Sequence, residues 1–263
     1  MLKCCVGIAL GLLSVPSAAW AGAWTLPQGT GGWFATVTAA SSTNYFDGSG
    51  LASTPRYDKD EAQLLIEYGL TDRLTAIVEP ELQHIDIAAP TSADRTGLGY
   101  TEFGARYGFV ADPTWVFSGQ ATLRVPGTDD TSNPAAVGYT DVEADLRLLL
   151  GHNFKLADLP AFFDVEVAER VRTAGYPSEF RADATLGVKV LPQWLLLAQS
   201  FNVISEGAGI SVFGGSYEYY KLQLSAVYEL TPTWSLQGGG YVTYAGLNAL
   251  QENGLIFSVW HRF

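Results

Sequence analysis

The sequence has little cysteine and histidine, and after its first segment it has no long apolar run. Of its 263 residues, two are cysteine and three are histidine. Both cysteines, Cys4 and Cys5, fall in a leader that we expect to be removed, which excludes disulfides, thiolate metal sites and cysteine nucleophiles from the mature chain. No later segment approaches a run of about 18 uncharged apolar residues, the minimum for a membrane-spanning helix. If the chain enters a membrane, it must therefore do so as closed β-structure.

Positive charge is also scarce. The chain carries 15 lysine and arginine residues against 27 aspartate and glutamate residues, a formal net charge of −12 at pH 7. Such an acidic chain lacks the basic surface that nucleic acids attract, so we expect no nucleic-acid partner.

The first 21 residues have the order of a secretory signal peptide. Lys3 supplies the charged start, Val6 to Val15 form a short apolar core, and small residues lead to Ala19-Trp20-Ala21. This order is typical of a cleaved leader with an A-x-A cleavage site. Because Ala21 is followed by glycine and neither cysteine stands at the cleavage site, we expect no lipidation. The sequence thus predicts a signal peptide (1–21) and one mature domain (22–263).

Short turns rich in proline, aspartate and threonine alternate with longer polar segments. The short turns lie at 70–74, 111–115, 191–194 and 230–234, with a fifth and longer one at 155–160. Proline and aspartate favour tight hairpin turns. The longer segments, mostly rich in Gly, Ser, Asp or Asn, are 47–56, 89–97, 127–137, 174–177, 205–216 and 248–253. Short turns at one end and long loops at the other are the plan of an up-and-down transmembrane β-barrel.

Apolar and polar residues alternate with a period of two between these turns. From Asp141 to Leu150, one face carries Val142, Ala144, Leu146, Leu148 and Leu150, and the other carries Asp141, Glu143, Asp145 and Arg147. Segments 179–190 and 220–230 alternate in the same way. Period-two patterning sends successive side chains to opposite faces of a strand. The apolar face then points either outward to lipid or inward to the core of a soluble barrel.

Three features favour the outward orientation. The polar face carries several ionisable groups per strand, which the packed core of a soluble barrel would not hold. Trp115, Trp194 and Trp234 each start a strand directly after a short turn, where an interfacial aromatic girdle lies. The chain ends in an amphipathic strand, 257–263, that closes on Phe263 and is similar to the assembly signal of bacterial outer-membrane barrels. We predict an all-β, up-and-down antiparallel transmembrane β-barrel in a bacterial outer membrane, with both termini in the periplasm.

About 12 strands are expected, and an even number returns both termini to one side. The segments are 31–46, 58–70, 73–87, 99–110, 114–126, 139–152, 160–173, 178–191, 193–204, 216–230, 233–246 and 253–263. They exceed the about 9–11 residues that cross the hydrocarbon, so we expect them to continue beyond the outer leaflet. The segment from Trp194 to Asn202 is ambiguous because three consecutive leucines, 195–197, interrupt its alternation.

Projecting the polar faces inward gives a predicted set of lumen-lining residues. They are Glu79, Glu81, Glu102, Arg106, Arg124, Asp141, Glu143, Asp145, Arg147, Asp164, Glu166, Arg170, Arg181, Asp183, Lys189 and Lys221. Such charges can line a passage that selects polar solutes. They can equally pair across strands and fill the barrel. The sequence leaves both alternatives open.

The few histidines argue against catalysis. No G-x-S-x-G motif occurs, and no cluster has metal-ligand spacing. We expect His152 and His261 to take interfacial, aromatic-like positions near the periplasmic end, and His84, beside Asp86, to be solvated near the outer end. The sequence predicts no catalytic residues, cofactor or metal. A lipid-modifying outer-membrane enzyme is the least favoured alternative.

Three stretches resemble a known family. GAWTLPQGTG (22–31), GLGYTEFGARY (97–107) and the ending VWHRF (259–263) are similar to XagA-like outer-membrane barrels. The resemblance implies a link to polysaccharide synthesis and biofilm formation, in which a barrel passes a glycan outward. Segment 97–107 also resembles the wider group named for the MetA pathway of phenol degradation, which implies uptake of aromatic compounds.

The leading hypothesis is a non-enzymatic outer-membrane channel or export component that passes an exopolysaccharide during biofilm formation. The alternatives are an uptake channel for small aromatic or other solutes, and a plugged structural or adhesive barrel. The expected partners are outer-membrane lipid and lipopolysaccharide, the barrel-assembly machinery through the C-terminal strand, and polysaccharide-synthesis proteins.

Overall fold

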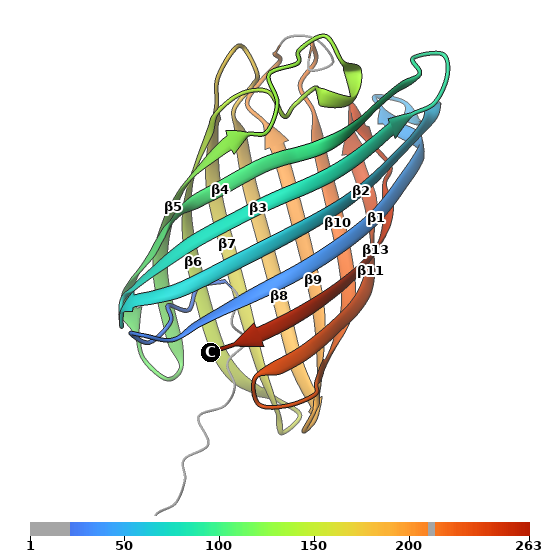
Figure 1. Cartoon of the computed structure of the whole chain (residues 1–263). Helices are drawn as coiled ribbons and strands as arrows, with labels where there is room; N and C mark the ends of the chain where they lie inside the picture. The colour runs from blue at the N-terminus through green and yellow to red at the C-terminus, as the bar shows by residue number, and fades with distance from the viewer. Residues whose placement is uncertain (1–21, 210–213) are drawn as a thin grey trace, which may run out of the picture.

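The computed structural model describes residues 22–209 and 214–263, which form a closed antiparallel β-barrel of twelve long strands (Figure 1). The predicted fold class is therefore confirmed. The predicted signal peptide, residues 1–21, lies outside the described residues, as do residues 210–213. The long strands are β1 (Gly31–Asp47), β2 (Gly50–Thr71), β3 (Leu74–Ile87), β4 (Ala93–Ala111), β5 (Trp115–Pro126), β6 (Glu143–Leu156), β7 (Leu159–Arg172), β8 (Glu179–Leu191), β9 (Trp194–Ser205), β10 (Glu218–Glu229), β11 (Trp234–Leu247) and β13 (Asn253–Arg262).

Each long strand pairs with its neighbour in the chain, and the last pairs with the first. β13 runs beside β1 from Gly32↔Arg262 to Ser41↔Asn253, while β1 also pairs with β2. A short piece, β12 (Ala249–Leu250), adds to the far end of β1. Closure leaves no long strand edge unpaired among the described residues, which satisfies the backbone groups that a membrane cannot hydrate. None of the described helical residues makes a helix long and apolar enough to cross a membrane.

Five short turns gather at one end of the barrel, together with the C-terminus and residues 22–30 (Figure 1). The turn predicted to be longer, 155–160, is a two-residue hairpin: Ala157 and Asp158 have φ angles of 49° and 67°, the left-handed pair that tight hairpins use. In another turn, Asp112 accepts hydrogen bonds from the backbone N–H groups of Trp115 and Thr114, each at 2.7 Å, and these bonds lower the pKa of its carboxyl. We call the end of the barrel where the five short turns gather the short-turn end, and the opposite end the long-loop end.

Two predicted loops are largely strand. The segment 47–56 was expected to be a loop because of its glycine and serine content, but β2 already begins at Gly50. Asp47 accepts hydrogen bonds from the Ser49 backbone N–H and hydroxyl, each at 2.7 Å, and so reverses the chain in two residues. Likewise β4 begins at Ala93, inside the predicted loop 89–97. Pairing with a neighbouring strand overrides weak local propensity.

Asp141 is a correction of a different kind. It was expected on a strand starting at 139, but β6 begins at Glu143, so Asp141 lies in the connection 127–142. Its side chain accepts a hydrogen bond from the neighbouring Thr140 hydroxyl at 2.8 Å. The alternation that begins at Asp141 is real, yet the backbone at that point belongs to the loop.

The connection 127–142 folds onto the mouth of the barrel. It contains a 3-10 turn, η1 (Pro134–Ala136), in which Ala135 and Ala136 are buried. The Tyr100 hydroxyl on β4 lies 3.0 Å from the Gly138 carbonyl and 2.9 Å from the Asp141 carbonyl, in donor geometry to both. These contacts tie the loop to the inside of the wall.

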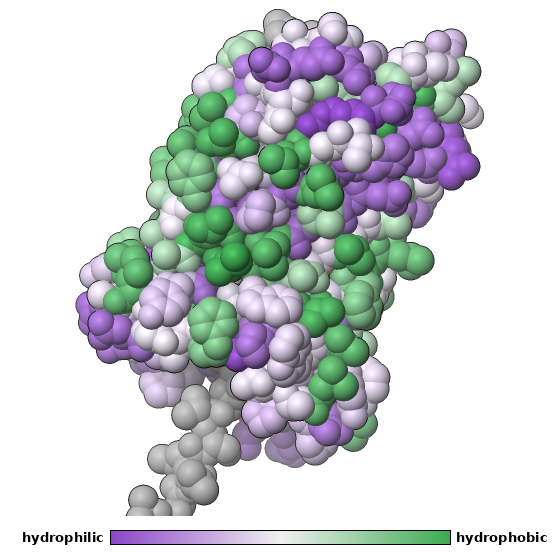
Figure 2. All heavy atoms as spheres, in the orientation of Figure 1, coloured by the Kyte–Doolittle hydropathy of each residue, from purple (hydrophilic) through white to green (hydrophobic). Residues whose placement is uncertain are grey.

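Apolar side chains face outward and charged ones face inward. On β6, Leu146 and Leu148 are 58% and 51% exposed, whereas Glu143 and Asp145 are 3% and 1% exposed. Figure 2 shows apolar side chains gathered across the middle of the barrel and hydrophilic ones above them, toward the long-loop end. This arrangement is the one that a barrel surrounded by lipid requires.

The ambiguous strand, β9, follows the same rule. Trp194 and Leu196 are exposed on the outside, while Leu197 is buried. Leu197 packs inside the barrel against Phe162 and Val227, and Leu195 packs against the same cluster. Leu196 therefore faces outward, whereas Leu195 and Leu197 join an apolar cluster inside the barrel.

Aromatic side chains surround the short-turn end on the outer face. The ring centroids of Trp115 and His152 are 3.9 Å apart and the rings are stacked. Trp234 lies 4.2 Å from His261, and Trp194 lies 4.9 Å from Tyr228. These rings form the outward-facing aromatic belt expected at a membrane interface.

Candidate functional site: the barrel interior

The half of the interior nearer the long loops contains a cavity of about 760 Å³. Its lining comes from strands all around the barrel and from the connection 127–142. Thr91 and Asn248, both exposed residues of the rim, also line it. The cavity therefore extends to the long-loop end of the barrel.

One wall of the cavity is rich in arginine. Four arginines and two glutamates from β5–β8 line it: Arg124, Arg170, Arg172, Arg181, Glu143 and Glu179. Arg172 Nε lies 2.8 Å from Glu143 Oε1, and Arg181 Nη1 lies 3.0 Å from Glu179 Oε2. The cations outnumber the carboxylates among these lining residues, so we call this side the positive wall; behind the lining, Glu102 and Asp145 pair with Arg124 and Arg170.

The wall across the barrel has the opposite balance. Two lysines and three glutamates line it: Lys59, Lys221, Glu61, Glu81 and Glu252. Lys59 Nζ lies 2.8 Å from Glu61 Oε2, and Lys221 pairs with Glu252. Among its lining residues the cavity is therefore polarised in formal charge, with an excess of cations on one wall and of carboxylates on the other.

Deeper in the barrel the charges pair across strands. Arg147 contacts three carboxylates: Asp183 at 2.8 Å, Asp145 at 3.4 Å, and Glu166. The same Asp145 also holds Arg170, at 3.1 Å. The sequence left two alternatives open, a charged passage or charges that pair across strands. The structure contains both: a layer of paired charges, and a cavity between that layer and the long loops.

The remaining predicted residues occupy different settings. Arg106 pairs with the buried Glu67 at 2.9 Å, Lys189 pairs with Glu229 at 2.9 Å, and Arg124 bridges Glu102 and Glu143. Glu79 stands opposite Glu102 in the ladder between β3 and β4. Asp164 lies against Gly22 and Ala23, and Asp141 is on the loop.

Tyrosine is the residue type that the sequence interpretation missed. Tyr57, Tyr100, Tyr139, Tyr217 and Tyr219 all line the cavity. The Arg124 guanidinium lies 4.1 Å from the centre of the Tyr100 ring, and the Tyr217 hydroxyl donates to Glu179. Tyr219 was predictable, because it shares the parity of Lys221. Tyr100 was also predictable, because it shares the parity of Glu102 and Arg106 on the same strand.

The short-turn half of the interior is occupied by the chain's own residues 22–30, which we call the N-terminal segment. The backbone N–H of Ala23 donates to Asp164 Oδ1 at 3.3 Å, and its carbonyl accepts from Ser118 Oγ at 2.8 Å. Arg106 Nη1 donates to the Trp24 carbonyl at 3.1 Å. The Leu26 N–H donates to Thr75 of β3 and the Gly29 N–H donates to the Gly69 carbonyl of β2, so five barrel strands hold the segment.

Trp24 completes the closure by joining two apolar clusters. One consists of Phe34, Phe162, Leu197, Val227 and Trp260, and the other of Ala23, Val116 and Leu149; Trp24 packs against both. Its ring lies so close to Gly151 that a Cβ there would approach it to 2.6 Å. Trp24 and these two clusters therefore fill interior space at the short-turn end.

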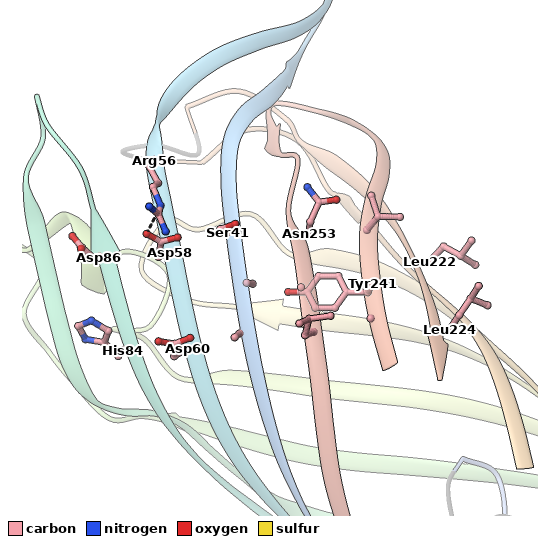
Figure 3. Close-up of a pocket in the computed structure, with 16 residues that line it drawn as sticks. Ser41, Arg56, Asp58, Asp60, His84, Asp86, Leu222, Leu224, Tyr241 and Asn253 are labelled. Carbon is pink, nitrogen blue, oxygen red and sulfur yellow. Dashed lines mark ion pairs between the residues drawn. The ribbon is translucent and has the colours of Figure 1, made fainter. Parts of the chain in front are cut away.

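A groove of about 830 Å³ on the outer wall is separate from this interior (Figure 3). Asp58 and Asp60 of β2 face outward there beside His84 and Asp86 of β3, and Arg56 pairs with Asp58 at 2.7 Å. Polar side chains on the outer surface indicate that this part of the wall lies beyond the apolar band around the middle of the barrel. No group of three or more His, Cys, Asp or Glu residues in the described part of the chain is placed to hold a metal ion.

Comparison with known proteins supports the fold. No family model matches the chain, and no curated protein is similar to it, so the resemblance to XagA-like barrels gains no support. Among solved structures, an outer membrane channel from Pseudomonas putida F1 is 15% identical with a TM-score of 0.71, over 92% of this chain and 98% of that one.

Two further solved structures are similar over most of their length. The NanC porin has a TM-score of 0.54 at 10% identity, over 86% of this chain and 98% of that one. The β-domain of the Bordetella autotransporter Brka has a TM-score of 0.58 at 15% identity, over 89% of this chain and 99% of that one. At such identities the likeness shows a shared fold, that of outer-membrane β-barrels.

Proposed function

We propose that this chain is a bacterial outer-membrane channel that takes up small, charged, ring-bearing solutes. The short turns and both termini face the periplasm, and the long loops face outside. The observation that carries the proposal is the polarised cavity, which reaches the outer rim while the N-terminal segment closes the opposite end. The barrel fold alone does not decide the function, because autotransporter domains share it.

The size of the cavity favours a small solute over a polymer. Its volume of about 760 Å³ lies within the range of about 300–1,000 Å³ typical of small-molecule sites. A glycan leaving the cell would have to enter from the short-turn end, where the N-terminal segment and its apolar contacts lie. A small solute that arrives from the outside can enter the cavity before it meets that segment, whereas a glycan would have to displace the segment first.

The lining favours a ring that carries an acidic group. Arginines on one wall attract anions, and tyrosine rings offer faces on which an aromatic or sugar ring packs. Tyr100 and Arg124 stack on each other and so offer a ring face and a cation at the same place. Tyr100 belongs to the segment 97–107 that resembles the phenol-degradation group, and an aromatic acid fits that resemblance.

The proposal is tested by solute flux through the purified mature protein in liposomes. We expect benzoate to enter faster than cyclohexylmethanol or a glycan oligomer, and an Arg181→Gln variant to lower benzoate flux several-fold because the positive wall loses one cation. Arg56→Gln, on the outer wall, is the matched control and should leave flux unchanged. Equal permeability to all three solutes, or none to any solute even after removal of residues 22–30, would contradict the proposal.

A further inference from the structure

Gly22 lies against the carboxylate of Asp164 inside the barrel. A Cβ built on Gly22 would stand 1.6 Å from Asp164 Oδ2 and 2.4 Å from its Cγ, so no side chain fits there. Gly22 also has a φ of +80°, which glycine adopts without strain. Its nitrogen is bonded to the same α-carbon and is therefore within reach of the carboxylate. The next N–H, that of Ala23, already donates to Asp164 Oδ1.

Asp164 lacks a cation. It is 3% exposed, and among the described residues no lysine or arginine lies within 4.0 Å of it. Other buried carboxylates of the interior, such as Asp145 and Glu143, each hold at least one arginine. Glu166, two positions along the same face, contacts the Asp164 side chain and is itself paired with Arg147, while Arg106 acts on Asp164 only from beyond 4.0 Å. Two neighbouring buried carboxyl groups repel each other when both are ionised, so this place favours a further positive group beside Asp164.

We infer that removal of the signal peptide supplies this group. Hydrolysis of the Ala21–Gly22 amide adds one water, leaving a carboxylate on Ala21 and an amine on Gly22. The amine takes up a proton, because an α-amino group has a pKa of about 7.7–8.0. The resulting ammonium pairs with Asp164 and holds the N-terminal segment in the barrel. We call this contact the Gly22–Asp164 latch.

The latch makes closure of the barrel depend on processing. Before cleavage, Gly22 offers Asp164 an uncharged amide, and seating the segment would leave the neighbouring carboxyl groups of Asp164 and Glu166 without this ammonium. After cleavage the same position carries the missing charge, and glycine provides the space for it. Cleavage after Ala21 is therefore the step that lets the N-terminal segment close the barrel. That this closure controls the passage of solutes rests on the proposed function.

The latch is tested by the accessibility of a buried reporter, without any measurement of flux. The mature chain has no thiol, so Leu26→Cys introduces a single cysteine at a site that is 3% exposed. The barrel is refolded starting at Gly22, with a two-residue Ser-Ala extension, or with an acetylated α-amino group. We expect a water-soluble thiol reagent to modify the extended and acetylated forms about tenfold faster, the ratio that 1.4 kcal/mol provides.

Two substitutions separate the latch from general loosening. Asp164→Asn in the chain starting at Gly22 should give the same acceleration, and combining it with the extension should add nothing further, because both remove one interaction. Glu229→Gln, which breaks the Lys189 pair at the same end of the barrel, should leave the rate unchanged. Equal rates for the processed and extended chains, or additive effects of Asp164→Asn and extension, would overturn the latch. Since the reporter does not depend on conductance, a seated latch in a silent barrel would refute only the channel.

Discussion

Deletion of residues 22–30 should convert the barrel from a nearly closed conductor into an open one, with a single-channel conductance several-fold higher. The barrel itself should persist, because β1 begins at Gly31 and its ladders with β2 and β13 do not involve the deleted residues. What disappears is the material that fills the short-turn end, including the Trp24 ring between two apolar clusters. Planar bilayer recordings of the two refolded proteins measure the difference.

A smaller change at the same place serves as the graded control. Trp24→Ala removes the ring but keeps the backbone bonds of Ala23 and Leu26 to Ser118, Asp164 and Thr75. We therefore expect brief openings and a mean current between those of the intact and deleted forms. If the deletion left the conductance unchanged while the protein still migrated as a folded barrel, residues 22–30 would not be the closing element.

The largest effect on stability is expected for Arg147→Met. This guanidinium, 13% exposed, serves three carboxylates, Asp145, Glu166 and Asp183. Removing one partner of a buried ion network costs about 3–5 kcal/mol, because the remaining charges stay desolvated and unpaired. Urea unfolding of the refolded protein, followed by tryptophan fluorescence, measures the loss.

An exposed pair gives the matched comparison. Arg56→Met breaks the contact with Asp58 at 2.7 Å, but the Arg56 side chain is 66% exposed, so the loss should stay below about 1 kcal/mol. Arg147→Lys should fall between the two, since a lysine keeps the charge but cannot reach all three partners in a planar fork. Similar free energies of unfolding for Arg147→Met and Arg56→Met would show that the inner network is hydrated and loosely held.

Strand positions and their facing were predictable where one surface is apolar and the other charged. On β6 and β10 the alternation separates an apolar face from a polar one, because each step along a strand reverses the face. The ionisable groups on the polar face and the Trp residues after the short turns then identify the apolar face as the outer one. These signals are local, and the ladder in the structure preserves them.

Features that depend on distant contacts were not predictable from the same pattern. The three leucines of β9 gave no orientation, because Leu195 and Leu197 join an interior apolar cluster whose other members come from four other strands. The N-terminal segment has no periodicity, since at Ala23 and Leu26 its backbone bonds to side chains, and only Gly29 and Thr30 bond to the backbone of β2. Its place inside the barrel depends on partners that are distant in the sequence.

The limits of the strands were misjudged for a related reason. Glycine and serine in 47–56 indicate a loop, yet residues 50–53 pair with Asn44–Asp47 and so extend the sheet. Leu98 likewise faces outward, although it shares the parity of the inward-facing Tyr100, because β3 and β4 shift register between Pro80 and Leu82. Composition indicates the secondary structure that a segment favours in isolation, whereas pairing with a neighbouring strand determines the structure that it adopts in the barrel.

The facing of the strands, apolar to lipid and polar to the interior, is tested most directly by single cysteines at four consecutive positions of β10, from Leu222 to Ser225. Leu222 and Leu224 are exposed on the outside, whereas Gln223 bonds to Gln199 and Ser225 to Gln237 inside. Nitroxide labels in reconstituted protein should therefore meet the lipid-soluble relaxant oxygen at 222 and 224, and meet a water-soluble nickel chelate more readily at 223 than at either. Labels that respond alike at all four positions, or in the reverse order, would contradict this orientation and the channel built on it.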